Sequence, residues 1–387
     1  MQKIWQDLSL SALVAGFVTV LVGFTSSVAI IFQAAQTLGA DAAQLSSWMW
    51  ALGLGMGLTS IGLSLYYKTP IATAWSTPGA AMLIVSGAGV AMPAAIGAFM
   101  VAGLLIALVG FTGWFDRLLQ HLPPSLAAAM LAGILLQFGL QAFSTLQAHL
   151  LLGSLMLLAY ILVRPWAPRT AVPLALVMGM LVANAEGLLS WQQISLHWAK
   201  PVWITPIFDV AAVLNLALPL FVVTMTSQNA PGAATLRAAG YQPPISNLIG
   251  WTGIATVLLA PFGCFALNLA AITAAICLGR DAHPDPEKRY IAAVFAGVFY
   301  CLVGLAGASV ISLFSAMPGA LIALIAGLAL LSTIGQSLAN ALQETRERDA
   351  ALLTFLVTAS GISLLGISAA CWGLLLGVAA RAYWSRK

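Results

Sequence analysis

The sequence has very little charge for its length. Only 7% of its 387 residues are charged and 61% are apolar, whereas a typical soluble domain has about 25% charged residues. So few charges cannot cover a water-facing surface, and most of the surface must therefore contact lipid. The composition excludes a soluble globular protein. The net charge of +4 does not indicate a nucleic-acid partner either, because cations in short loops suit an anionic membrane leaflet.

Signatures of ATP hydrolysis and of metal binding are missing as well. The chain has no P-loop and no cluster of histidines with carboxylates, so it predicts neither an ATP-driven pump nor a metal site or other cofactor. No pairing of a nucleophile with a base favours an enzyme. The four cysteines have no CxxC spacing and lie in or beside apolar segments, as is typical of buried free thiols.

Acidic residues are absent from the interior of the apolar segments. Asp41, Glu186 and Asp209 fall near segment ends, and the other acids fall in connecting segments. Proton relays in membranes usually use an intramembrane Asp, Glu or His. A coupled proton would therefore be carried by the substrate itself or by a residue at the membrane edge.

Apolar segments occupy most of the chain. A helix needs about 17–25 residues to cross a bilayer, and fourteen candidate spans fit, although twelve or thirteen crossings also agree with the hydropathy. The first span is too long for a cleaved signal peptide. The spans are predicted at 10–35, 45–67, 70–88, 92–113, 123–141, 147–163, 170–186, 209–229, 244–261, 264–279, 290–307, 318–337, 350–366 and 368–384.

The basic residues sort to one side of this arrangement. Fourteen of the fifteen Lys and Arg residues fall on the side of the two termini, and only Lys200 falls on the other. Cytoplasmic loops retain Lys and Arg while outward loops lose them. The pattern predicts a multi-pass membrane protein with cytoplasmic N- and C-termini.

Two pairs of similar segments indicate an internal repeat. Segment 25–27 (Thr-Ser-Ser) resembles 226–228 (Thr-Ser-Gln), each fourteen residues before a glycine, and segment 124–133 resembles 318–327. Chance similarity in an Ala- and Leu-rich chain is the alternative. Matched segments are seven spans apart, so the two halves would cross the membrane in opposite directions. Inverted repeats are typical of secondary transporters, whose substrate site lies near the midplane between broken helices.

Two spans contain interruptions at matching places in the two halves. In the third span, Pro70 and Pro78 bracket a stretch too short for a crossing helix. Proline suits the first position of a new helix, and Ser76 or Thr77 can cap it. In the tenth span, Asn268 is the candidate cap before an Ala- and Ile-rich run. We expect extended segments followed by half-helices whose N-termini attract an anion, with proline-kinked helices as the alternative.

Polar and aromatic side chains near these interruptions are candidates for ligand binding. Span 8 contains Thr226, Gln228 and Asn229, which are costly to leave unpaired in hydrocarbon and are therefore functional candidates, with helix–helix hydrogen bonds as the alternative. Trp75 and Phe265 precede the two expected caps and could flank a ligand ring, unless they only pack. Weaker candidates in span 12 are Ser332, Thr333 and Gln336.

Four of these segments resemble the motifs of one family. Residues 74–81, 226–232, 271–277 and 347–350 resemble the BenE benzoate:proton symporter family, and the resemblance covers essentially the whole chain. It implies proton-driven uptake of benzoate or a similar aromatic acid across the bacterial inner membrane.

The architecture also resembles that of the uracil and nucleobase-ascorbate carriers. This resemblance implies an all-α integral membrane fold of 7+7 inverted repeats, over 1–190 and 205–387. A core domain would comprise spans 1–4 and 8–11, and a gate domain spans 5–7 and 12–14. Those carriers usually place acidic residues in spans 8 and 10, where this chain has Gln228, Asn229 and Asn268. A site without fixed negative charge suits an anionic substrate, because like charges repel.

Together these observations lead to the hypothesis of an elevator-like secondary transporter of an aromatic carboxylate. Its expected partners are the substrate, a proton and the lipid bilayer, with a homodimer as one assembly. A carrier for another organic anion or a nucleobase-like ring, and an anion channel, are the alternatives. The expected substrate-binding residues are Trp75, Ser76, Thr77, Thr226, Gln228, Asn229, Phe265 and Asn268.

Overall fold

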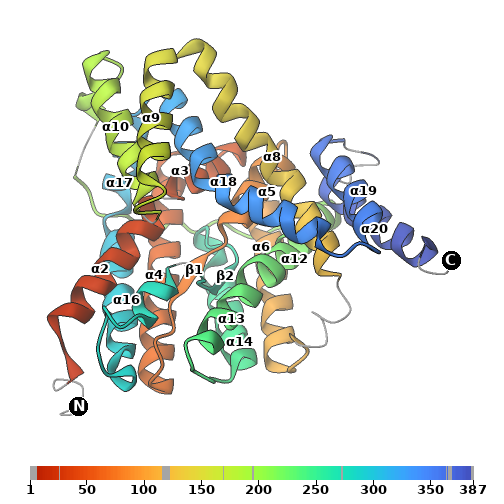
Figure 1. Ribbon diagram of the computed structural model, residues 1–387, viewed down its shortest axis with the longest axis horizontal. Helices are drawn as coiled ribbons and strands as arrows, with labels where there is room; N and C mark the ends of the chain where they lie inside the picture. The colour runs from red at the N-terminus through yellow and green to blue at the C-terminus, as the bar shows by residue number, and fades with distance from the viewer. Residues whose placement is uncertain are drawn as a thin grey trace.

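The computed structural model is mostly helical, with two short strands near its centre (Figure 1). Five of the cations expected on the cytoplasmic side lie outside the described residues: Lys3, Arg117, Arg169, Arg386 and Lys387. The structure describes residues 7–25, 27–115, 123–168, 170–193, 196–271, 273–362, 364 and 368–384.

The first half of the chain is a series of helices with one strand. Its first two helices are bent against each other by 41°, and its strand leads directly into a short helix. The elements are α2 (Leu10–Thr25), α3 (Val28–Thr37), α4 (Ala42–Tyr67), β1 (Thr73–Trp75), α5 (Thr77–Ser86), α6 (Met92–Phe111), α8 (Pro124–Ala148), α9 (Leu150–Val163) and α10 (Ala171–Ala185).

The second half repeats this alternation, with π-helical turns η2 and η3 inside its first long helical span. The elements are η1 (Trp191–Gln193), α11 (Val210–Ala212), η2 (Val213–Ala217), α12 (Leu218–Thr224), η3 (Met225–Asn229), α13 (Ala230–Ala238), α14 (Ile245–Leu259), η4 (Ala260–Phe262), β2 (Leu267–Leu269), α15 (Ala274–Leu278), η5 (Pro286–Lys288), α16 (Tyr290–Leu305), α17 (Gly307–Ser315), α18 (Gly319–Gln343), α19 (Arg348–Ala359) and α20 (Ala369–Trp384).

Several helices are long and apolar enough to cross a membrane. Among the described residues there are seven, or eight if the bent pair α2 and α3 forms one span. Helices α5, α9 and α10 are apolar but shorter. The chain is therefore a multi-pass helical membrane protein, and the arrangement of fourteen spans, which also includes the shorter helices, stays a prediction.

Glycines allow close helix crossings in both halves. Where α4 crosses α16, a Cβ atom on Gly53 would lie 2.5 Å from the Cα of Gly304. Where α6 crosses α14, a Cβ atom on Gly110 would lie 2.5 Å from the Cα of Gly250. Small residues at such crossings let two backbones approach, which is how helices associate where lipid removes the hydrophobic driving force.

The two extended segments expected in spans 3 and 10 are present as strands, and they pair with each other, which was not predicted. β1 and β2 form an antiparallel two-stranded sheet, although they lie almost two hundred residues apart (Figure 1). Backbone N–H and C=O groups inside a membrane must find partners within the protein, and pairing satisfies both extended segments at once. The partners are Thr73 with Leu269, Ala74 with Asn268 and Trp75 with Leu267.

Hydroxyl groups of the preceding helices complete this sheet. The Ser60 hydroxyl of α4 accepts a hydrogen bond from the Thr73 N–H at 3.0 Å. The Thr256 hydroxyl of α14 accepts one from the Leu267 N–H at the same distance. Each strand therefore begins with its first amide held by the long helix before it.

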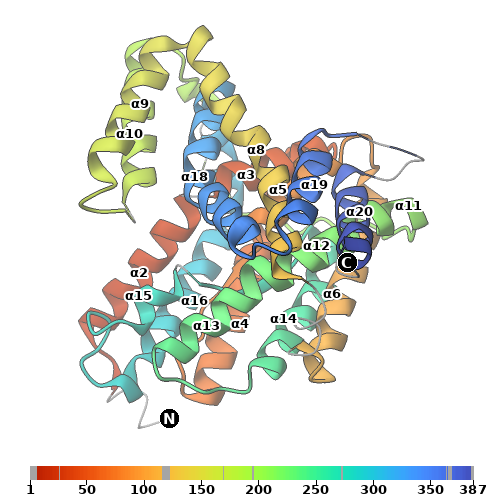
Figure 2. The ribbon, with the colours of Figure 1, turned by 45° about the vertical axis from the view of Figure 1, so that its right-hand side comes forward.

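The helices form two groups. Helices α8, α9 and α10 lie with α18 at the top of Figure 1, and α19 and α20 lie at its right-hand side; in the turned view of Figure 2, α9 and α10 stand apart from the helices around the sheet. Within this group α8 packs against α18 and α19, and α9 packs against α10. In the other group α4 packs against α16, and α6 packs against α14. Helix α17, which follows α16 directly, was not expected from the sequence.

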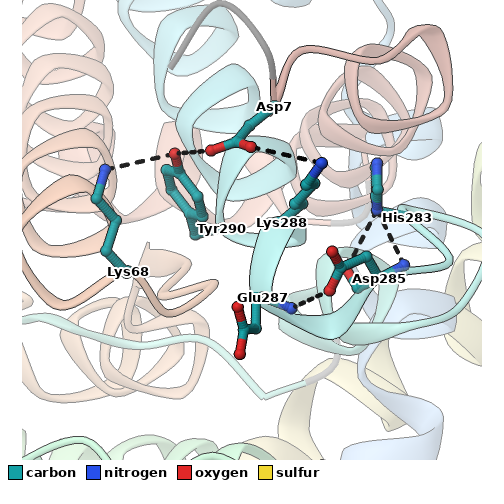
Figure 3. A network of polar contacts seen from close by, with 7 residues as sticks. All are labelled: Asp7, Lys68, His283, Asp285, Glu287, Lys288 and Tyr290. Atoms are coloured by element: carbon teal, nitrogen blue, oxygen red, sulfur yellow. Dashed lines mark hydrogen bonds and ion pairs between the residues drawn. The ribbon is translucent and has the colours of Figure 1, made fainter. Parts of the chain in front are cut away.

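Charged side chains join the ends of three helices away from the sheet (Figure 3). Asp7, which precedes α2, accepts a hydrogen bond from the Tyr290 hydroxyl at 2.7 Å and lies 3.8 Å from the Lys288 ammonium. Lys68, which follows α4, places its Nζ 4.4 Å from the centre of the Tyr290 ring. These contacts tie the ends of α2, α4 and α16 together.

Candidate functional site

A cavity of about 820 Å³ lies between the two groups of helices. This volume falls within the range of about 300–1,000 Å³ that is usual for small-molecule sites. The sheet, the half-helices and η3 line one wall, and α8 and α18 line the other. The polar residues on the first wall include Thr77, Thr226, Ser227, Gln228, Thr273 and Tyr300.

The wall has polar groups but no formal charge. None of the lining residues in the described part of the chain is Asp, Glu, His, Lys or Arg. Uncharged donors in a partly dry cavity can still favour an anion, because hydrogen bonds to a charged acceptor are stronger than neutral ones. The cavity can therefore accommodate an amphipathic guest with an apolar body and one charged or polar end.

Ser76 caps α5, as predicted, and does not line the cavity. Its hydroxyl accepts a hydrogen bond from the Gly79 N–H at 3.1 Å, and its carbonyl accepts one from the Ala80 N–H at 2.8 Å. The Thr224 hydroxyl donates to the Ser76 hydroxyl at 3.1 Å. Ser76 therefore stabilises the start of α5 without lining the cavity.

Because Ser76 caps α5, few N–H groups at the start of this helix are free to bind an anion. Pro78 has no N–H, and the N–H groups of Gly79 and Ala80 are already paired. Thr77 lines the cavity, and neither its N–H nor its hydroxyl has a partner among the residues that the structure describes. Thr77 is therefore the donor that α5 presents to a guest.

Span 8 contributes its polar residues through the π-helical turn η3. Such turns widen a helix locally and occur often at functional sites. The Thr226 and Ser227 hydroxyls donate to carbonyls of their own helix, which leaves them as acceptors toward the cavity. The Gln228 side chain lines the cavity and has no hydrogen-bond partner within the described chain, so its amide is free to bind a ligand.

Asn229 is buried beside the sheet and does not line the cavity. Its Oδ1 accepts a hydrogen bond from the Leu269 N–H at 2.9 Å, and its Nδ2 lies 3.3 Å from the Met225 sulfur. The alternative of a structural hydrogen bond therefore describes Asn229 better than ligand binding. It joins span 8 to β2.

Trp75 lines the cavity as predicted for a residue that flanks a ligand. Its indole N–H donates to the Ser27 hydroxyl at 2.9 Å, and its ring packs against Phe24 with 5.3 Å between centroids. The side chain is thus held from two sides at the bend between α2 and α3. A fixed aromatic wall offers large apolar contact area to a ring-shaped guest.

The structure overturns the expectation that Asn268 caps a half-helix. Asn268 lies in the middle of β2, opposite Ala74, whereas the residue before α15 is Thr273. The Asn268 Nδ2 donates to the Ala266 carbonyl at 3.1 Å, and its buried Oδ1 has no partner among the described residues. The cap was misplaced because the strand extends farther than the Ala- and Ile-rich pattern indicated.

Phe265 is also removed from the cavity. It is fully buried and packs between Trp48 and Phe99, with centroid distances of 5.7 and 5.8 Å. The expected equivalence with Trp75 fails because Phe265 precedes β2, while Trp75 is the last residue of β1. Phe265 belongs to the aromatic core behind the sheet.

Sequence reasoning missed several lining residues. Thr273 precedes α15, Tyr300 comes from α16, and Ser27 comes from the bend after α2. Thr273 lies in the family-motif segment 271–277 and Ser27 in the repeated segment 25–27, whereas nothing in the local sequence of Tyr300 signals binding. On the opposite wall, the polar lining residues of α18 are the three weaker candidates of span 12 and three more: Ser332, Thr333, Gln336, Ser337, Asn340 and Gln343.

Comparison with known proteins identifies the group to which this chain is related. A family model described as "BenE: Benzoate membrane transport protein" matches residues 6–383. The inner membrane protein YdcO of Escherichia coli (strain K12) is 51% identical over 365 residues, which are 94% of this chain and 93% of that protein. The benzoate membrane transport protein of Acinetobacter baylyi is 41% identical over 375 residues, 97% of this chain and 95% of that one.

Solved structures share the fold at low sequence identity. SLC26A9 aligns with a TM-score of 0.63 and 12% identity over 96% of this chain, which spans 65% of SLC26A9. The transmembrane domain of the cyanobacterial bicarbonate transporter BicA aligns with a TM-score of 0.57 and 13% identity, over 95% of this chain and 97% of that domain. These likenesses establish a membrane-transporter fold. With the family match over nearly its whole length, the chain belongs to the BenE family of benzoate membrane transport proteins.

Proposed function

We propose that this protein is a secondary active transporter that takes up benzoate or a related aromatic carboxylate with protons across the bacterial inner membrane. The observation that carries the proposal is the polar, uncharged cavity beside the paired strands, in a chain of the BenE family. The relative from Acinetobacter baylyi, named as a benzoate transport protein, supports the choice of substrate.

The lining suits both ends of an aromatic carboxylate. Trp75 and Met56 offer apolar contact to the ring, and Thr77 and Gln228 have unpaired donors for the carboxylate. A carboxylic acid with a pKa near 4 is ionised at pH 7, so the absence of acidic groups from the described lining removes a source of repulsion.

We further propose that the cavity opens to the cytoplasm in this state and that both termini lie on that side. The cavity extends to Pro124 at the start of α8 and to Gln343 at the end of α18. Arg346 and Arg348 follow Gln343 directly, and loops rich in Arg and Lys stay in the cytoplasm. Chemical labelling of a cysteine placed at Gln343, from one side of the membrane at a time, tests this orientation.

Fourteen spans in two inverted repeats, over 1–190 and 205–387, form the proposed architecture. Matching features of the two halves lie the same number of residues apart in the sequence, which supports this repeat. Segment 124–133 lies 194 residues before 318–327, and the crossing glycines Gly103 and Gly110 lie 194 residues before Gly297 and Gly304. The antiparallel register centred on Ala74 and Asn268 has the same separation, as a two-fold axis through that pair requires.

We propose an elevator-like mechanism on the basis of a division of the spans into a core and a gate domain. Spans 1–4 and 8–11 would form a core domain that carries the sheet, and spans 5–7 and 12–14 a gate domain against which it moves, within a protomer that can pair as a homodimer. The cavity lies at the boundary between these parts. Because the described lining has no carboxylate or histidine, we propose that the proton travels with the substrate or through a residue at the membrane edge.

Uptake of labelled benzoate into proteoliposomes under an inward proton gradient tests the function. We expect saturable uptake that is faster with the gradient than without it, and accelerated exchange when the vesicles contain unlabelled benzoate. Flux that never saturates and shows no exchange would indicate an anion channel instead. Absence of any uptake, with nucleobases or other anions transported, would replace benzoate as the substrate.

A further inference from the structure

Tyr300 is a polar residue in an apolar helix that the mechanism above does not use. It lies in α16, is only 2% exposed, and lines the cavity. The position 194 residues earlier, which the crossing glycines match to it, is Ile106, a fully buried core residue of α6. The phenol is therefore a feature of one half of the molecule alone.

The hydroxyl end of Tyr300 is fixed where α2, α15 and α16 meet. The phenol lies beside the side chain of Thr273, the residue before α15. Gly23 of α2 leaves the space for both side chains, because a Cβ atom there would lie 2.8 Å from the Tyr300 Oη and 3.1 Å from the Thr273 Cγ2. The same glycine carbonyl accepts a hydrogen bond from Ser27 at 2.9 Å, and Ser27 holds Trp75.

Tyr300 and Thr273 together have at least one O–H donor that a bond between them does not use. Tyr300 and Thr273 each have one O–H donor, and a bond between the two hydroxyls would use at most one of them. Neither side chain has another hydrogen-bond partner among the described residues, and both line the cavity. One O–H group is therefore available to a guest.

We propose that Tyr300, together with Thr273, is a specificity-determining residue that donates a hydrogen bond to the carboxylate of the bound substrate. The inference rests on the proposed function, which places an aromatic carboxylate in this cavity. A hydrogen bond to a charged acceptor is worth about twice a neutral one. The pair therefore favours a carboxylate over a neutral group of the same shape, which apolar packing by itself cannot do.

Binding of benzoate and of benzamide to the purified full-length protein, measured by titration calorimetry, tests this inference. Benzamide has the shape of benzoate without its charge. For Tyr300→Phe we expect benzoate binding to weaken roughly 10-fold or more and benzamide binding to change less than about 3-fold. Tyr290→Phe, on the same helix but outside the cavity, is the matched control and leaves both affinities unchanged.

Three further variants keep the inference testable if Tyr300→Phe fails to fold. Thr273→Val removes the partner hydroxyl and should cause the same selective loss, whereas Thr273→Ser retains the hydroxyl and should keep most of the affinity. Gly23→Ala should also weaken benzoate selectively, because the added methyl displaces the Tyr300 hydroxyl.

The outcomes separate this inference from the proposed function. If the wild-type protein binds no aromatic carboxylate, the proposed function fails and this inference fails with it. If wild type binds benzoate but Tyr300→Phe binds it equally well, or loses benzoate and benzamide alike, the function stands and the role of Tyr300 is packing.

Discussion

The two interrupted spans share one sheet but end in different ways. β1 leads directly into α5, a half-helix of 10 residues whose N-cap Ser76 bonds Gly79. β2 leads to α15, which has 5 residues, and Thr273 before it makes no capping bond. Backbone pairing is thus nearly symmetric, whereas the side chains that support it are not. The difference indicates that the strand pair is the shared scaffold and that each half has its own means of holding it.

The supports themselves differ in kind. In the first half, serine hydroxyls accept hydrogen bonds from the backbone: Ser60 at the start of β1, and Ser76 at the start of α5. In the second half, Thr256 holds the start of β2, but the amide of Asn229 and a left-handed glycine, Gly263, supply the rest. Substitutions in the two halves should therefore have unequal effects.

The largest effect is expected at Gly263, which has no glycine counterpart before β1. Its φ is +99°, and a Cβ atom there would collide with the indole of Trp48. Gly263→Ala should prevent accumulation of folded protein, as seen by fluorescence-detected size-exclusion chromatography. Gly89→Ala is the control, since Gly89 has φ +81° with no atom within 4 Å of the added Cβ, and should cost only about 1–2 kcal/mol. A normal elution profile for Gly263→Ala would contradict this assignment.

The next effect separates two neighbours in span 8. Asn229→Ala leaves the buried Leu269 N–H without its partner, which should cost about 1–3 kcal/mol of stability and lower the melting temperature. Gln228→Ala removes an amide with no partner in the described chain and should leave the melting temperature unchanged while raising KM for benzoate. The reverse pattern, with Gln228→Ala destabilised and Asn229→Ala stable, would exchange their roles.

A smaller effect is expected at the two helix starts. Ser76→Ala removes the cap of α5 and should cost about 1 kcal/mol. Thr273→Ala removes no capping bond and should not reduce stability on that account, although it should weaken benzoate binding through the loss of the Tyr300 partner. Melting curves of the two variants measure the difference, and equal destabilisation would remove the asymmetry between α5 and α15.

The smallest effect is expected at Asn268. Asn268→Ala makes β2 like β1, where the paired residue is already Ala74. The variant loses the hydrogen bond to Ala266, which lowers stability, and removes a buried side-chain carbonyl without a partner, which raises it. The two effects should cancel to within about 1 kcal/mol. KM for benzoate should stay at the wild-type value. A large rise in KM with unchanged stability would restore Asn268 to the binding site.

Sequence reasoning located the site better than it assigned individual side chains. The interruption before α5 was predictable because proline and a capping serine act on their immediate neighbours, and Thr77, Trp75 and Gln228 do line the cavity. Asn229 and Phe265, which were expected to bind the substrate, lie behind the sheet and do not line the cavity. Which side of a buried element faces a cavity depends on partners far away in the chain, and composition does not specify them.

Tyr300 illustrates the opposite error. A single tyrosine in an apolar helix has no local pattern that distinguishes a packed ring from a binding group. Its hydroxyl is recognised as a binding candidate only from its position beside Gly23 of α2 and Thr273, which precedes α15.

By itself, the sequence determined that this is a multi-pass membrane protein with two broken spans, because hydropathy, charge and proline act through local physics. Its similarity to known sequences placed it in the BenE family. Only the tertiary structure decided that the two extended segments pair, which is their means of satisfying backbone groups away from water. It also decided which polar residues face the cavity and which brace the sheet, because that choice depends on contacts between segments far apart in the chain.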